Sequence, residues 1–186
     1  MISSFEKILQ ETTILQGERI TLRKFRAEDY LDAYEYGSDE LTLKYLIWEG
    51  YKSLDDAREG IPAFNMVQQG MFAIELKETG KCIGAIDIRP MPEHEKSGFG
   101  YVLNRKYWKN GYMTEALRAI LAFCFDTLEL NKVESNHFVG NEGSGRVMQK
   151  CGMVKEGLIR QEQKVKGVFH DSVHYGITKA DWELLR

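Results

Sequence analysis

A glycine turn stands directly ahead of the most regular helical pattern in the sequence. Asn110-Gly111-Tyr112 precedes a run from Met113 to Leu128 in which apolar residues recur three and four positions apart. Glycine lets a backbone approach a ligand closely, and the first N–H groups of a helix have no partners inside it. With the positive end of the helix dipole, they form a site for an anion such as a pyrophosphate. By itself this signal is weak, because ordinary loops also use glycine.

A second group of polar residues lies in the stretch NEGSGRVMQKCGM. Asn141 follows a predicted strand, and Ser144 comes three residues later at the start of a predicted helix. The amide and the hydroxyl either face a ligand beside the preceding helix or form a turn and a helix N-cap. Spacing alone does not decide between these two interpretations.

Hydrophobic periodicity predicts the elements that hold these residues. Strands are expected at 19–25, 71–76, 82–88, 99–103, 132–138, 155–163 and 172–178, and Gly80 suits a hairpin turn between the second and third. Helices are expected after Glu28-Asp29, over 53–64 with a kink or an end at Pro62, over 113–128, and over 144–152. This order predicts an α/β fold with a sheet of mixed direction.

Composition limits the function classes. The 186 residues, 43% of them hydrophobic, suffice for one domain, 1–186, in which 1–17 form an N-terminal lead-in. A net charge of −3 without a basic run gives no reason to expect nucleic-acid binding. Cys82, Cys124 and Cys151 are predicted to be buried, reduced thiols with neither a disulfide nor a metal site. No apolar segment approaches the ~20 residues of a membrane span, so a cytoplasmic protein is expected.

Several separated motifs in one order give a resemblance to a known family. They are GERITLRKFRAEDY, YVLNRKYWKNGYMTEAL, NEGSGRVMQKCGMVKEG and FHDSVHYGI, and they extend over nearly the whole chain. The sequence resembles the GCN5-related N-acetyltransferases (GNAT), in particular the RimJ/RimL-like branch, which acetylates N-terminal amines of ribosomal proteins and, in other members, small amines. The resemblance implies a GNAT-type fold, with a V-shaped, mostly antiparallel sheet of about six to seven strands flanked by helices. It also implies acetyl-CoA as cosubstrate, no metal, and a monomer or homodimer.

The resemblance assigns coenzyme-binding residues by position. The family's pyrophosphate loop, Q/R-x-x-G-x-G/A, falls on Trp108, Lys109, Asn110, Gly111, Tyr112 and Met113, with Thr114 next. Trp108 and Met113 depart from that pattern, which the RimJ/RimL-like branch tolerates because backbone N–H groups bind. The pantetheine arm would pair with the main chain of Tyr101, Val102 and Leu103, and the side chain of Asn141 would hydrogen-bond either the pantetheine or the reacting centre, where it would be catalytic. Outlying phosphate contacts would come from Arg146 and Lys150, and the basic residues upstream of the turn, Arg105, Lys106 and Lys109, can add positive charge.

Catalysis in such an enzyme is a direct attack of the amine on the thioester. Ser144, directly or through water, would protonate the leaving thiolate, although solvent can also do so, and a backbone N–H of the 101–103 strand would polarise the carbonyl. Many relatives carry a glutamate where this sequence has Gly98, so Glu134, His137 and Glu162 are candidate bases acting through water. An α-amine, with a pKa near ~8, can also lose its proton to water without a dedicated base.

Acceptor binding is implied for Tyr45 and Trp48 in the aromatic stretch YLIWEGY, although plain core packing explains them equally well. The terminal His170-Asp171 and Tyr175 are interpreted as mainly structural, and Glu115 as a favourable charge in the first helical turn. Three functions stay open: acetylation of a protein N-terminus, ribosomal or other; acetylation of a small amine such as an antibiotic, polyamine or amino acid; or a non-catalytic acyl-CoA-binding sensor.

Overall fold

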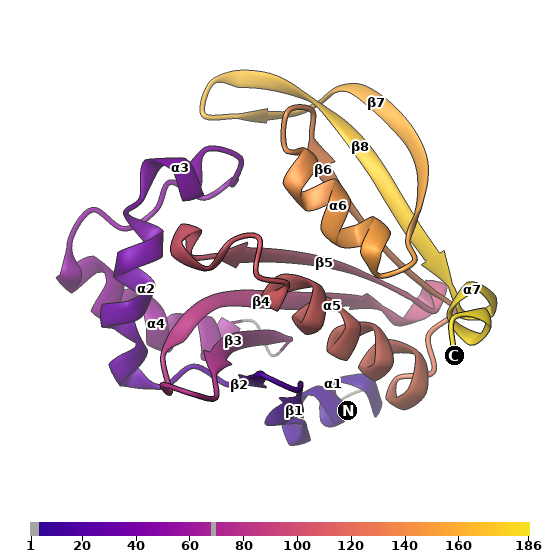
Figure 1. The fold of residues 1–186 in the computed structure, drawn as a ribbon, viewed down its shortest axis with the longest axis horizontal. Helices are drawn as coiled ribbons and strands as arrows, with labels where there is room; N and C mark the ends of the chain where they lie inside the picture. Colours follow the sequence, from indigo (N-terminus) through magenta and orange to yellow (C-terminus); the bar gives the residue numbers. More distant parts are fainter. Residues whose placement is uncertain (1–3, 68–69) are drawn as a thin grey trace.

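Eight segments pair as strands of one sheet in the computed structural model, which describes residues 4–67 and 70–186 (Figure 1). They are β1 (Ile14–Gln16), β2 (Ile20–Arg23), β3 (Met71–Leu76), β4 (Cys82–Met91), β5 (Lys96–Leu103), β6 (Lys132–Phe138), β7 (Val154–Val165) and β8 (Val168–Thr178). The order is β1-β2-β3-β4-β5-β6-β8-β7, and every pair is antiparallel except β5–β6. The mixed, mostly antiparallel sheet is confirmed. The extra strand is β1, which lies with helix α1 (Ser4–Glu11) in the segment expected to be a lead-in.

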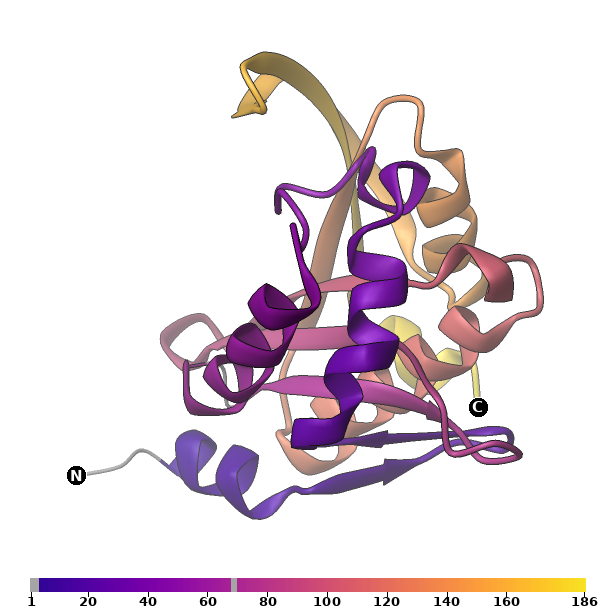
Figure 2. The ribbon, with the colours of Figure 1, turned by 90° about the vertical axis from the view of Figure 1, so that its left-hand side faces the viewer.

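Helices cover both faces of this sheet. The larger core cluster joins α1, α5 (Tyr112–Ala122) and α6 (Glu142–Lys150) to one face, and a smaller cluster joins α2 (Tyr30–Gly37) and α4 (Leu54–Val67) to the other. In Figure 2 α2 faces the viewer with α4 beside it. The short helices α3 (Glu40–Leu43) and α7 (Lys179–Leu184) follow α2 and β8. No helix in the described ranges is long and apolar enough to cross a membrane.

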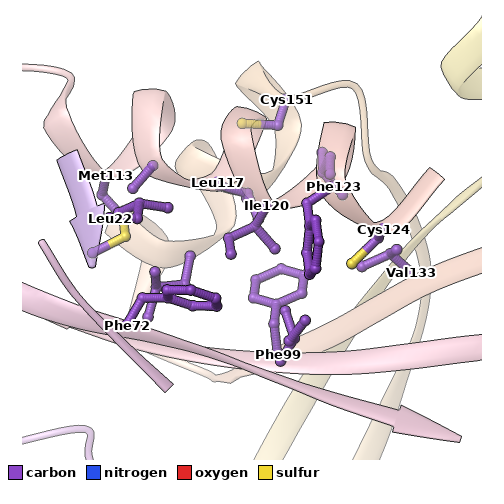
Figure 3. Packing of buried hydrophobic residues seen from close by; sticks show 14 of the residues in the cluster. Leu22, Phe72, Phe99, Met113, Leu117, Ile120, Phe123, Cys124, Val133 and Cys151 are labelled. Carbon is purple, nitrogen blue, oxygen red and sulfur yellow. The ribbon is translucent and has the colours of Figure 1, made fainter. Parts of the chain in front are cut away.

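The predicted apolar stripe of α5 is confirmed as the face that packs on the sheet. Met113, Leu117 and Ile120 are at most 5% exposed and lie over Phe72 and Phe99 (Figure 3). The helix ends earlier than predicted, because residues Phe123–Thr127 widen into a π-helical turn. Packing of this stripe holds the start of α5 in place, and the first N–H groups of the helix, directly after the glycine turn, are held with it.

Two sequence predictions, one about the thiols and one about Pro62, have different outcomes. The three thiols are free and buried, as expected, and burial raises the pKa of each to about 12, which keeps them protonated. The prediction that Pro62 kinks or ends its helix is wrong about the end, because α4 continues to Val67. Proline removes a single N–H donor, and the burial of Ala57 and Ile61 in the smaller cluster holds the helix across that gap.

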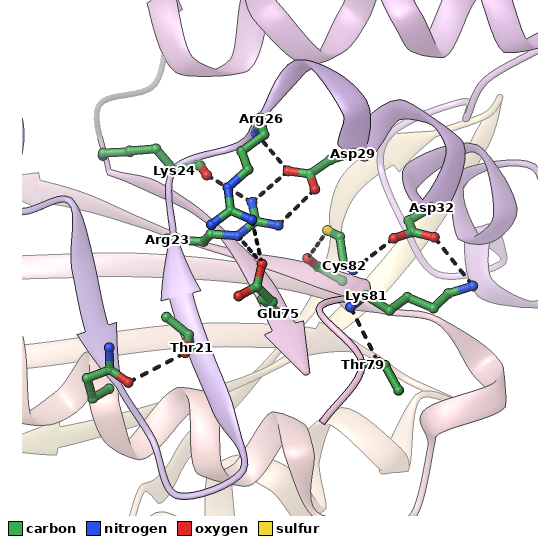
Figure 4. A network of polar contacts seen from close by, with 12 residues as sticks. Thr21, Arg23, Lys24, Arg26, Asp29, Asp32, Glu75, Thr79, Lys81 and Cys82 are labelled. Atoms are coloured by element: carbon green, nitrogen blue, oxygen red, sulfur yellow. Dashed lines mark hydrogen bonds and ion pairs between the residues drawn. The ribbon is translucent and has the colours of Figure 1, made fainter. Parts of the chain in front are cut away.

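A buried charge network ties β2 to β3 and to the start of α2 (Figure 4). Arg23 is 4% exposed; it donates through Nη1 and Nη2 to Asp29 at 2.7 and 2.8 Å and through Nε to Glu75 at 2.6 Å. Burial alone would lower the pKa of Arg23, but the hydrogen bonds to Asp29 and Glu75 outweigh it and raise that pKa. These hydrogen bonds satisfy Arg23 within the protein and stabilise the junction of β2, β3 and α2.

Candidate active site

The sheet opens between β5 and β6. The two strands pair only at Lys96–Gly98 with Lys132–Glu134, and beyond that point they diverge (Figure 1). Residues Phe99–Leu103 keep β4 on their other edge, and toward β6 the described pairing gives them no strand partner. Backbone N–H and C=O groups on such an edge need partners, so the opening can bind an extended chain of amides.

A cavity of about 500 Å³ occupies this opening. Most predicted site residues line it: Tyr45, Tyr101, Val102, Leu103, Trp108, Lys109, Gly111, Met113, Thr114, Asn141, Ser144, Arg146 and Lys150. Asn110, Tyr112, Trp48 and Glu134 do not line it. Sequence reasoning missed the remaining lining residues, Leu41, Thr42, Leu46, Gly140, Glu142, Gly143 and Val147. No local motif marks Leu41, Thr42 and Leu46, whereas Glu142 and Gly143 lie between two residues that were predicted.

The glycine turn has the conformation that its predicted role requires. Lys109 and Gly111 adopt left-handed φ values of 63° and 85°, and Gly111 is the N-cap of α5. Glu115 N donates to Gly111 O at 3.0 Å, so the N–H groups before it in the first turn lack helical partners. The indole Nε1 of Trp108 donates to Leu103 O at 2.7 Å and joins the turn to the end of β5. Gly111, Met113 and Thr114 line the cavity, and free N–H groups at a helix N-terminus can bind an anion.

A hydroxyl pair connects β5 to α6 in the wall of the cavity. Tyr101 Oη lies 2.7 Å from Ser144 Oγ and also donates to the Ser144 carbonyl at 3.2 Å. Burial raises the pKa of Tyr101, so the phenol stays protonated at neutral pH. The alternative of Ser144 as a helix N-cap is wrong, because α6 begins at Glu142 and its N-cap is Asn141. The Asn141 side chain makes no capping hydrogen bond, although it lines the cavity.

Glu134 lies at the closed end of the opening. It pairs in register with Gly98, and its carboxylate contacts Lys96 at 2.6 Å and Lys132 at 3.3 Å. Partial burial opposes ionisation, but these two ammonium groups outweigh it and lower the pKa of Glu134. A carboxylate held by two cations outside the cavity is poorly suited to accept a proton from a substrate amine.

The other two candidate bases are also engaged outside the cavity. His137 is buried; its Nδ1 lies 2.9 Å from Phe138 O, and its ring stacks on Tyr175 at 5.7 Å. Glu162 contacts His174 Nε2 at 2.9 Å, and although burial opposes it, this contact helps to lower the pKa of Glu162. Neither residue is among the cavity-lining side chains.

The aromatic residues of the predicted acceptor segment take two different positions. Tyr45 lines the cavity next to Gly140, where an added Cβ would lie 3.1 Å from the Tyr45 hydroxyl oxygen. Trp48 packs edge-on against Tyr51, with ring centroids 4.7 Å apart, and joins the smaller core cluster. The packing interpretation therefore describes Trp48, while Tyr45 remains next to the site.

Two of the residues near the C-terminus that were predicted to be mainly structural make a packing contact and a hydrogen bond. Tyr175 is buried in the larger core, and Asp171 Oδ1 accepts from Gln161 N at 2.8 Å. Among the described residues no three His, Cys, Asp or Glu side chains gather as metal ligands.

Comparison with known proteins identifies the family. Residues 19–154, more than half of the chain, match the family model described as an acetyltransferase (GNAT) domain. The putative ribosomal N-acetyltransferase YdaF of Bacillus subtilis is 32% identical over 90% of this chain and 95% of its own. An uncharacterized N-acetyltransferase, p20, of Bacillus licheniformis is 30% identical over 90% of this chain and 97% of its own length. The crystal structure of a GNAT-family acetyltransferase from Bacillus anthracis superposes with a TM-score of 0.82 at 27% identity, over 90% of this chain and 99% of that one. The chain thus belongs to the GNAT acetyltransferase family and is an acetyltransferase enzyme.

Proposed function

We propose that the protein transfers the acetyl group of acetyl-CoA to the N-terminal α-amine of a ribosomal or other protein. The observation that carries this proposal is the opening between β5 and β6, whose cavity joins the glycine turn to the Tyr101–Ser144 hydroxyl pair. One end offers N–H groups to an anion, the wall offers unpaired backbone to amides, and the other end offers a proton donor.

The residues present fit acetyl-CoA. Residues 100–102 of β5, which have no strand partner toward β6, suit the amide groups of a pantetheine arm, and the left-handed turn at Lys109 and Gly111 suits a pyrophosphate. The side chains of Lys109, Arg146 and Lys150 line the same cavity and add positive charge. Acetyl-CoA supplies an activated thioester, so the protein itself needs no covalent intermediate.

The chain's own groups account for the proton and charge movements of a direct transfer. The amine nitrogen bonds to the acetyl carbon while the carbon–sulfur bond breaks. A backbone N–H on the Tyr101–Leu103 edge stabilises the charge that develops on the carbonyl oxygen. Ser144, hydrogen-bonded to Tyr101, donates a proton to the thiolate and takes one back from the water that accepts the amine proton. The amine proton leaves to water, because all three predicted bases lie outside the cavity lining.

The residues at the acceptor side of the cavity favour a peptide N-terminus. The acceptor side carries Leu41, Thr42, Tyr45 and Leu46, which suit a short peptide with small or apolar side chains. The name of the relative YdaF, a putative ribosomal N-acetyltransferase, supports the same acceptor class.

The test is thiol release from acetyl-CoA with a panel of acceptors. Peptides with N-terminal Ala, Ser or Met, including ribosomal protein N-termini, are compared with spermidine, an aminoglycoside and free amino acids. We expect release with peptides, and mass spectrometry should locate the acetyl group on the α-amine and not on a lysine. Release with the small amines alone would overturn the acceptor assignment.

The sequence left a sensor without turnover open, because Gly98 carries no carboxylate and the three other candidate bases are engaged elsewhere, but membership of an acetyltransferase family argues against it. Thermal stabilisation by acetyl-CoA without thiol release across the whole panel would support it. The absence of both stabilisation and release would overturn both functions.

A further inference from the structure

Glu115 makes contacts that a simple first-turn charge would not make. Its Oε1 accepts from the backbone N–H of Arg19 at 2.7 Å and of Ile20 at 3.3 Å, and its Oε2 accepts from Arg19 Nε at 2.9 Å. The Glu115 side chain is 16% exposed. The carboxylate therefore joins the first turn of α5 to the start of β2, which lies 95 and 96 residues earlier in the chain.

Arg19 extends this connection to the glycine turn itself. Its Nη1 donates to Asn110 O at 3.0 Å, and its guanidinium carbon lies 4.5 Å from the centre of the Tyr112 ring. An added Cβ at Gly111 would lie 3.3 Å from Arg19 Nη2. One guanidinium thus touches or borders three consecutive residues of the turn.

The pairing with Arg19 also offsets the repulsion between the Glu115 carboxylate and an anion bound at the glycine turn. A carboxylate in the first turn of a helix repels an anion bound at that helix N-terminus. Burial opposes the ionisation of Glu115, but its hydrogen bonds with Arg19 and Ile20 outweigh burial and lower its pKa. Arg19 neutralises the resulting charge at 2.9 Å, so the negative charge is fixed toward β2.

The pair borders the coenzyme cavity. Arg19 and Glu115 line a second hollow, of about 580 Å³, which shares Gly111, Thr114 and Lys150 with the first cavity. A substitution in the pair therefore affects the glycine turn through direct contacts, without intervening residues.

We propose that Arg19 and Glu115 are positioning residues. They hold Lys109 and Gly111 of the glycine turn in their left-handed conformations, so that the N–H groups of the turn are placed to bind a pyrophosphate before the coenzyme arrives. This inference rests on the proposed coenzyme site and adds the means by which the turn is preorganised. Preorganisation removes the ordering cost from binding, so its loss weakens affinity for a ligand that uses the turn.

The test compares two acetyl donors on Glu115→Ala. Acetyl-CoA contains the pyrophosphate, whereas acetylpantetheine ends before it. We expect kcat/KM for acetyl-CoA to fall about tenfold through KM, because weakened charge-assisted hydrogen bonds are worth at least that much. The value for acetylpantetheine should stay within about twofold of wild type, and Glu115→Gln should recover part of the loss.

Arg19→Met tests the electrostatic part. It leaves the Glu115 carboxylate without its cation beside the anion site, so KM for acetyl-CoA should rise more than in Glu115→Ala. Adding Glu115→Gln to Arg19→Met should then lower KM again.

The matched control is Glu75→Ala. Glu75 is also an arginine partner, bonded to Arg23 at 2.6 Å, and its side chain is 15% exposed. It should lower the melting temperature without changing the ratio of the two kcat/KM values. An unchanged ratio in Glu115→Ala would overturn the inference, provided that the wild type prefers acetyl-CoA. A wild type that binds neither acetyl-CoA nor CoA would overturn the proposed function and this inference with it.

Discussion

Replacing Gly111 with alanine separates the cost of a left-handed residue from the loss of a ligand site. Gly111 has φ +85°. An alanine there costs about 1–2 kcal/mol, and a smaller unfolded-state entropy returns about 0.4–1 kcal/mol of it. The net loss of about 1 kcal/mol should lower the melting temperature of a domain of this size by about 2–4 °C.

The same substitution should weaken the binding of acetyl-CoA by more than it lowers the stability of the fold. The new Cβ would lie 3.3 Å from Arg19 Nη2 in the turn that presents the N–H groups. Loss of one charge-assisted hydrogen bond to a phosphate is worth about 1.5–3 kcal/mol, so Kd for acetyl-CoA should rise about ten- to hundredfold. Isothermal titration calorimetry measures Kd, and a thermal melt without ligand measures the stability loss.

Gly80→Ala is the control for this experiment. Gly80 also has a left-handed φ, +71°, in the exposed β3–β4 hairpin, and an added Cβ there would meet nothing within 4 Å. It should lower the melting temperature by a similar amount and leave Kd unchanged. Equal acetyl-CoA affinity in the two variants would refute the reasoning that places the pyrophosphate at the Gly111 turn.

Two further predictions concern catalysis and pH. Ser144→Ala should lower kcat about tenfold or more while KM for acetyl-CoA changes little, because a proton donor acts in the transition state; an unaltered kcat would remove Ser144 from the mechanism. Hydrogen bonds from Lys106 and Lys81 lower the pKa of Glu35 to about 2, so its stabilising contribution is present above the unfolded-state pKa of ~4.3 and is lost as pH falls toward 2. Thermal melts should show Glu35→Gln less stable than wild type at pH 7, with the difference shrinking below about pH 4; a constant difference would contradict the assignment.

Local patterns in the sequence predicted most of the elements. The strands at 71–76 and 132–138 have the predicted bounds, and the Gly80 turn between β3 and β4 was identified from its glycine. β1 was missed because it has only three residues, with Ile14 53% exposed, and exists through its pairing with β2. Helix α7 was also missed, although the capping box of Thr178 and Asp181 is a local signal for its start.

The candidate site divides in the same way. The Gly111 turn is a local feature, so the residues themselves predicted the turn, while its role in coenzyme binding was predicted from the family resemblance. The contacts of Tyr101 with Ser144 and of Arg19 with Glu115 join residues 43 and 96 positions apart, and no periodicity encodes such pairs. The same holds for Glu134, whose two lysine partners become neighbours only when β5 and β6 pair.

The most direct measurement is a crystal structure of the protein with CoA bound. The account predicts electron density for the pantetheine arm between β5 and β6, hydrogen-bonded to the main chain of residues 101–103. It also predicts the pyrophosphate within hydrogen-bond distance of the N–H groups at residues 111–114. Coenzyme density outside the opening between β5 and β6, or a pyrophosphate away from the Gly111 turn, would contradict it.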